Sequence, residues 1–227
     1  MDFSLQTYEI IASVLALLVA IIGHEIMHGA VAYKYGDLTA KSRGRLSINP
    51  LVHIDPIGSI AVPAMMYFVP VLLGMGSGFL FGWAKPVPIN TNTVISNGGY
   101  NAAMQVSLAG IAYNFSLAIL AAVVLHNISQ PLTSDSFYYL FFYIFMMKLL
   151  IINVVLGVFN LIPIPQFDGA HFLSDLSLKY KINQVAQFFY KYERYGMVIV
   201  VIVLVSPLKD YLLIMPVQII LQQLMLK

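Results

Sequence analysis

The chain lacks cysteine altogether and has few charged residues. Of its 227 residues, 10% are charged and 59% are hydrophobic, and the mean hydropathy is +0.82. The missing cysteines exclude disulfides, thiolate metal ligands and a cysteine nucleophile. Because a soluble globular domain carries about 25% charged residues, the composition indicates a multi-pass integral membrane protein in a lipid bilayer. No basic cluster with interleaved aromatic residues is present, so a nucleic-acid partner is not expected.

The length sets how many membrane crossings are possible. A chain of this size has room for five or six spans of about 20 residues and for almost no domain outside the membrane. We therefore predict an all-α polytopic protein with a single domain over residues 1–227. Its core covers about residues 7–178, and further membrane segments lie at about 183–226. The acidic start, Met1-Asp2-Phe3, and the lack of a small-residue cleavage site argue against a signal peptide.

Three ionisable side chains stand inside the first apolar run, in the motif His-Glu-x-x-His at residues 24–28. On a helix His24 and His28 are one turn apart on the same face. Two imidazoles at that spacing can hold one Zn²⁺, with Zn–N distances near ~2.1 Å. Glu25 points to the side, where it can take a proton from water at the metal.

The alternative interpretation is a solvated helix face, because this motif has only three fixed letters and occurs by chance in soluble helices. The surrounding apolar sequence argues against it. Ionisable side chains in a lipid-embedded helix are costly and normally mark a functional site. We therefore predict a metal site at these residues.

Charge placement predicts how the first helix, about residues 7–33, is oriented. Four basic residues follow it, at positions 34, 41, 43 and 45, and the positive-inside rule places this end in the cytoplasm. His24 lies about 15 Å before Lys34 along the helix axis. The predicted active site is therefore within the membrane and nearer the cytoplasmic face.

Between the first helix and the Ser107–Asn114 helix we expect a small β-hairpin or re-entrant element. Residues 38–40 and 45–48 read as two short strands near the interface. Residues 57–83 are apolar but rich in glycine and proline, and we expect them to begin and end on the cytoplasmic side, with a bend at Gly74, Gly76 and Gly78. His53 and Asp55 are the other closely spaced pair of potential ligands, and we interpret them as polar groups satisfied in a turn.

A further apolar helix is expected over about residues 101–126. Ser107, Gly110 and Asn114 fall on one narrow face, where small residues permit close helix packing. Asn114 is a polar group at membrane depth and needs a partner. It either joins two helices or acts near the site, as a candidate substrate-binding residue.

The following helix, about residues 137–160, carries Lys148 in its middle and leads into the stretch Asn160–Gly169. Two prolines break the helix there, and unwound backbone at membrane depth is tolerated only beside protein or a wet cavity. Asp168 is the one carboxylate in this stretch. If a helix follows, Asp168 lies about 16 Å along its axis from the cytoplasmic membrane boundary that Lys179 marks. His24 is expected at that same depth. We therefore predict that Asp168 is the third metal ligand.

Four stretches together resemble the site-2 protease family of intramembrane zinc metalloproteases. They are GHEIMH at Gly23–His28, SLAGIAYN at Ser107–Asn114, NLIPIPQFDG at Asn160–Gly169 and FGWAKPVP at Phe81–Pro88. The chain looks like a short bacterial or archaeal type without a PDZ or CBS domain. The family commonly has proline after Leu-Ala-Gly, where this chain has Ile111. That departure concerns the bend of the helix and not the chemistry.

The resemblance implies a site and an activity. His24, His28 and Asp168 would bind one Zn²⁺ per chain, Glu25 would be the general base, and Asn160 would orient the substrate or stabilise the oxyanion. The expected enzyme is an intramembrane metalloendopeptidase of a prokaryotic cell membrane that cleaves membrane-anchored proteins, as in regulated intramembrane proteolysis. The rival hypothesis is a metal-handling transporter or a binding protein that uses the same site without hydrolysis, although such a site would not require Glu25 between its ligands.

Overall fold

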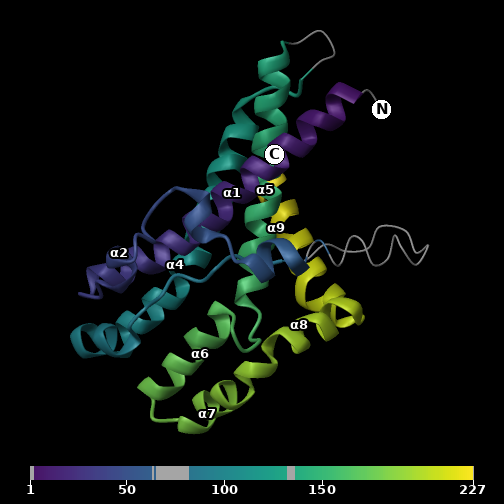
Figure 1. Cartoon of the computed structure of the whole chain (residues 1–227). Coiled ribbons are helices and arrows are strands. Elements are labelled where there is room, and N and C mark those ends of the chain that lie inside the picture. Colours follow the sequence, from purple (N-terminus) through teal and green to yellow (C-terminus); the bar gives the residue numbers. More distant parts are fainter. Residues whose placement is uncertain (1–2, 63, 65–81, 132–135, 227) are drawn as a thin grey trace.

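The computed structural model describes residues 3–62, 64, 82–131 and 136–226, and these ranges contain helices and no strand (Figure 1). The three longest helices are α1 (Phe3–Lys34), α4 (Thr91–Asn127) and α5 (Phe137–Leu161). Each is long and apolar enough to cross a membrane. They pack against one another in all three pairings and form the centre of the molecule.

The contacts between the three long helices fix their relative directions. Glu9 of α1 lies beside Lys148 of α5, and further along both helices the Ala20 carbonyl and Asn153 bind the same Asn114 side chain. Hence α1 and α5 run parallel. α4 runs antiparallel to both, because its later residue Asn114 contacts the earlier part of the histidine motif.

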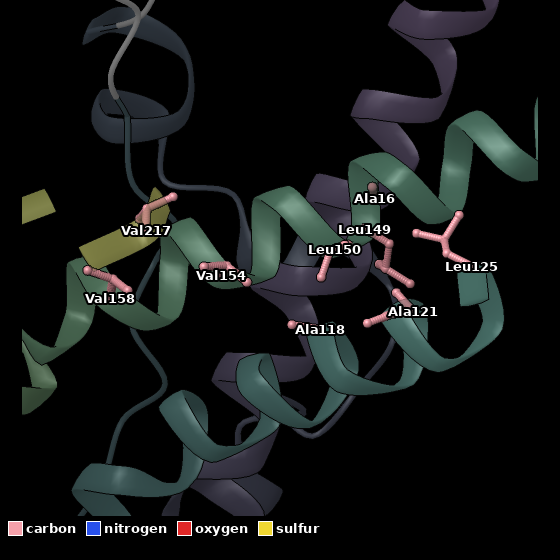
Figure 2. Close-up of a cluster of buried hydrophobic side chains, with 10 residues drawn as sticks. Ala16, Ala118, Ala121, Leu125, Leu149, Leu150, Val154, Val158 and Val217 are labelled. Carbon is pink, nitrogen blue, oxygen red and sulfur yellow. The ribbon is translucent and has the colours of Figure 1, made fainter. Parts of the chain in front are cut away.

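The seam between the helices is built from small side chains. Ala12, Ala16 and Ala20 follow one another at one-turn spacing on α1, and all three are fully buried. Ala16 meets alanines of α4, and α5 and α9 add larger side chains to the same cluster (Figure 2). Small residues let helix backbones approach closely where lipid tails give no hydrophobic drive for association. The outer faces of α1 carry exposed leucine, valine and isoleucine, as a lipid-facing surface requires.

The connection after α1 corrects the strand prediction. Residues 39–42 form the short helix α2 (Thr39–Ser42), and residues 45–48 are irregular. A 3₁₀-helix, η1 (Pro50–His53), and a π-helix, η2 (Pro56–Ala61), follow. The predicted bend at residues 74–78 lies outside the described residues. The two ends of that segment do meet, since the Trp83 N–H donates to the Gly58 carbonyl at 3.1 Å.

The C-terminal half begins with α6 (Asp168–Lys179) and α7 (Asn183–Tyr192), which lie at the end of the bundle away from the N-terminus (Figure 1). After η3 (Glu193–Tyr195), the chain forms α8 (Gly196–Val205), η4 (Asp210–Ile214) and α9 (Met215–Met225).

The structure supports fewer spans than the sequence predicted. The segments Asn183–Val205 and Asp210–Met225 are bent by 91° and together pass as one broken span or a re-entrant loop. The described residues therefore contain three spanning helices, or four if this pair counts as one. The predicted count of five or six is not confirmed.

Candidate metal centre

Three side chains from opposite parts of the chain meet between α1 and α6. His24 Nε2 and His28 Nε2 are 3.1 Å apart, and they lie 3.2 and 3.3 Å from Asp168 Oδ2. In the described residues these three form the one group of histidine and carboxylate side chains close enough to share a metal ion. The structure thus brings together the three residues that the sequence singled out as ligands.

The other ring nitrogen of each histidine has a partner. His28 Nδ1 lies 2.7 Å from the Val106 carbonyl oxygen of α4. A main-chain carbonyl only accepts hydrogen bonds, so His28 must carry its proton on Nδ1 and present a lone pair at Nε2. His24 Nδ1 lies 2.7 Å from Asn114 Oδ1. Both rings are therefore held by hydrogen bonds on the side away from Asp168, as metal-binding histidines usually are.

The donor atoms fit a zinc ion. Ligands placed tetrahedrally about 2.0–2.1 Å from zinc are separated from one another by about 3.3 Å. The three observed separations match that spacing. With the protons on Nδ1, the two Nε2 atoms and the carboxylate oxygen direct lone pairs at one point, and Asp168 Oδ2 has no hydrogen-bond partner. A cation placed between these three atoms would satisfy all of their lone pairs.

Two glycines make the close approach possible. A Cβ on Gly110 of α4 would lie 2.5 Å from His24 Cε1 and 2.5 Å from His28 Nε2. A Cβ on Gly169 would lie 2.3 Å from the Leu161 carbonyl oxygen at the end of α5. Gly110 therefore makes room for the two rings, and Gly169 lets α6 begin directly beside α5 with Asp168 at its first position.

The loop that leads to Asp168 is supported by α8. Ile162, Ile164 and Phe167 of the loop are buried against Val200 and Val203. A Cβ on Gly196, the first residue of α8, would lie 2.3 Å from the Pro165 carbonyl oxygen. The C-terminal segment thus packs against the loop that positions the third ligand.

Glu25 faces a different neighbour from the histidines. Its Oε2 accepts a hydrogen bond of 2.8 Å from the Val87 main-chain N–H. Val87 belongs to the extended segment 82–90, which is held by further hydrogen bonds at Lys85 and Asn90. Glu25 is therefore fixed beside His24, His28 and Asp168 without joining their group.

The remaining candidates have identified partners. Asn160 donates to the Leu156 carbonyl of its own helix at 3.0 Å. Asn114 contacts His24, so it lies at the site, and it also joins α4 to α1 and α5. His53 binds the Ser47 carbonyl and Asp55 accepts from the N–H groups that begin η2, which agrees with a role in the turn. Asn153, Val87 and Val106 also contact the site, and sequence reasoning did not identify them.

Comparisons with known proteins agree with this chemistry. A model of peptidase family M50 matches residues 127–205. The chain is 34% identical over 212 residues to "Putative zinc metalloprotease YwhC" of Bacillus subtilis (strain 168), and the alignment covers 88% of this chain and 83% of that protein.

It is also 29% identical over 185 residues to "Putative zinc metalloprotease Rip2" of Mycolicibacterium smegmatis (strain ATCC 700084 / mc(2)155), over 81% of this chain and 62% of that protein. No solved structure matches the chain significantly. The chain therefore belongs to peptidase family M50, the site-2 protease family of zinc metalloproteases.

Proposed function

We propose that this metalloprotease is an intramembrane endopeptidase that cleaves peptide bonds in or near transmembrane segments of membrane-anchored proteins. The observation that carries the proposal is the convergence of His24, His28 and Asp168 beside helices long enough to span a membrane. Regulated intramembrane proteolysis would then be its cellular role. The similarity to two proteins named as putative zinc metalloproteases favours hydrolysis over a metal-handling transporter.

In this proposal His24, His28 and Asp168 are the ligands of one zinc ion. Zinc supplies Lewis-acid chemistry, which lowers the pKa of water and polarises a carbonyl. Glu25 accepts the proton of the attacking water and delivers it to the leaving amine. Its hydrogen bond with the Val87 N–H supports this role, because it orients the carboxylate.

Asn160 is proposed to orient the substrate or to stabilise the oxyanion that forms at the scissile carbonyl. Its position just before the loop that leads to Asp168 supports this role. The substrate backbone must be unwound locally, because a helix shields its own carbonyl groups. Residues 1–227 act as one catalytic domain in this proposal.

The orientation in the membrane is also a proposal. Lys34 ends α1, and the basic residues Lys41 and Arg43 follow it, which supports a cytoplasmic position for this end of the bundle. The active site would then lie nearer the cytoplasmic face of a prokaryotic cell membrane.

The test uses purified full-length protein in proteoliposomes with a single-span protein as substrate. Glu25→Gln should retain about the wild-type zinc content and lose cleavage, because the amide cannot accept the proton. Asp168→Ala should lose both. Glu9→Gln, the same substitution on the same helix, is the matched control and should retain cleavage. Cleavage by Glu25→Gln at the wild-type rate would show that the base is assigned wrongly.

A further inference from the structure

Two asparagines are completely buried where the three long helices meet. Asn114 of α4 and Asn153 of α5 each have 0% exposure, and leucine, valine and alanine surround them. A primary amide buried without hydrogen-bond partners is destabilising. Buried asparagines are retained where hydrogen bonds compensate for their burial and serve a purpose. The hydrogen-bond partners of these two amides therefore identify their role.

The two amides form a chain of hydrogen bonds that ends at a metal ligand. Asn153 Nδ2 donates to the Leu149 carbonyl at 2.8 Å, and Asn153 Oδ1 accepts from Asn114 Nδ2 at 2.9 Å. Asn114 Nδ2 also points at the Ala20 carbonyl at 3.3 Å. Asn114 Oδ1 is then left to face His24 Nδ1 at 2.7 Å.

The direction of this chain is fixed at its far end. Main-chain carbonyls only accept hydrogen bonds, so the Leu149 carbonyl requires the NH₂ group of Asn153. Asn153 must therefore present its oxygen to Asn114, and Asn114 must present its own NH₂ group to Asn153 and Ala20. The oxygen that remains can only accept, which places a proton on His24 Nδ1.

We propose that Asn153 and Asn114 are positioning residues that hold His24 in the tautomer with its lone pair at Nε2, directed at the metal. This inference rests on the proposed assignment of His24, His28 and Asp168 as ligands. His28 needs no such chain, because the Val106 carbonyl fixes its ring directly. The tautomer of His28 is therefore set by the backbone of α4, and the tautomer of His24 is set by side chains of α4 and α5.

Helix packing alone would also explain two buried amides, but it predicts different behaviour. In a purely structural role, loss of either amide would lower stability and leave the zinc affinity of the folded protein unchanged. In the positioning role, zinc affinity depends on one feature of Asn114, an acceptor facing His24. Leucine removes that acceptor at similar size, whereas aspartate keeps it.

The experiment measures Zn²⁺ affinity of the purified full-length protein in detergent by competition with a chromophoric chelator. Asn114→Leu should bind zinc about 10- to 100-fold more weakly, the range typical for loss of a hydrogen-bond partner of a ligating histidine. Asn153→Leu should weaken binding less, because Ala20 still orients the Asn114 amide. Asn114→Asp should stay within a few-fold of wild type.

A packing control separates stability from affinity. Val154 is fully buried beside Asn153 in α5 and has no polar side-chain atom. Val154→Ala should lower the unfolding temperature and leave zinc affinity unchanged. In the zinc-free protein, ¹⁵N NMR of labelled histidine should show His24 protonated at Nδ1 in wild type and a mixture of tautomers in Asn114→Leu.

The outcomes distinguish this inference from the ligand assignment on which it rests. If His28→Ala abolishes zinc binding while Asn114→Leu binds zinc like wild type, the ligands are right and the positioning role is wrong. If His28→Ala binds zinc normally, the ligand assignment itself fails. Equal loss of affinity in Asn114→Leu and Val154→Ala would also overturn the inference, since both effects would then come from packing.

Discussion

At the scale of single residues, the metal centre depends as much on a missing side chain as on the ligands. Gly110 lies on α4 directly against both histidine rings, and no other residue leaves the space that they occupy. A methyl group added at this position would disturb the rings and not the helix, because alanine has a higher helix propensity than glycine. A substitution at Gly110 therefore tests the geometry of the site separately from the stability of the fold.

We therefore expect Gly110→Ala to fold normally and to bind zinc at least about 10-fold more weakly, because the added Cβ displaces the rings from their positions. Zinc affinity and circular dichroism in detergent would measure the two effects. Gly157→Ala is the matched control, since its Cβ would lie 2.9 Å from the Phe115 ring and not against a histidine. Zinc binding at the wild-type level in Gly110→Ala would contradict the close contact between α4 and the rings.

The sequence predicted the three side chains that the structure brings together as a possible metal-binding group. Spacing identified His24 and His28, and the depth estimate from Lys179 identified Asp168. Asn153 was not singled out, although a polar side chain within an apolar helix is the same signal that marked Asn114; its partner is known only from the structure. Asn114 was recognised as needing a partner, but not as the partner of His24.

At the scale of elements, the carboxylate of Asp37 connects the end of α1 to the start of α4 through hydrogen bonds. Asp37 Oδ1 accepts from the N–H and the hydroxyl of Thr39, and its Oδ2 accepts from the Asn90 N–H at 2.6 Å. Burial disfavours the charged form, but the hydrogen bonds from Thr39 and Asn90 outweigh it and hold the pKa of Asp37 below its usual value. The charged side chain therefore links the end of α1 to the start of α4.

This link gives stability a defined pH dependence. A carboxyl group with a lowered pKa contributes stability above its unfolded pKa of about 3.9, and the contribution is lost as pH falls through the lower, folded value. At pH 7 we expect Asp37→Asn to unfold more easily by about 1–3 kcal/mol, since the Asn90 N–H loses a charged acceptor. Thermal unfolding in detergent should show this difference narrowing below about pH 4. A difference that stays constant with pH would contradict the role of the charge.

The same carboxylate explains why the strand prediction for residues 38–40 was wrong. By accepting from Thr39, Asp37 starts the helical turn of α2. At residues 45–48, His53 binds the Ser47 carbonyl and Arg45 reaches the Lys85 carbonyl. The Ser47 carbonyl, which a strand ladder would need, is therefore taken by a side chain. Alternation of apolar residues could not reveal partners so far along the chain.

At the scale of the whole molecule, the proposed zinc ion joins the first helix to the second half of the chain. α6 packs against α4, α5 and α7 and presents Asp168 to the two histidines of α1. A ligand that binds only the folded state stabilises it according to its concentration relative to its dissociation constant. Zinc should therefore act as a link between the two halves of the chain.

Removal of the metal tests this link. At free zinc 100-fold above its dissociation constant, stabilisation is about 2.7 kcal/mol, so a chelator should lower the unfolding temperature of wild type by several degrees. The chelator should have no effect on Asp168→Ala. Thermal unfolding of both proteins in the same detergent provides the comparison. An equal response of the two proteins would show that the ion does not connect α1 with α6.

The topology was partly predictable because helix directions must alternate. Successive spanning helices alternate in direction, and in the structure α1 and α5 run parallel while α4 runs antiparallel to both. The predicted number of spans is not confirmed within the described residues. A 91° bend separates Asn183–Val205 from Asp210–Met225, and hydropathy alone cannot distinguish two full crossings from one broken one.

Two polar groups of the site are held by the main chain. The Val87 N–H binds Glu25, and the Val106 carbonyl binds His28. Replacing either valine by another apolar residue leaves these contacts in place, although at position 87 proline would remove the donor. Both positions can therefore drift during evolution while their function persists. A sequence comparison that scores amino-acid identity would not identify these two positions. Their role in the site is evident only from the course of the backbone.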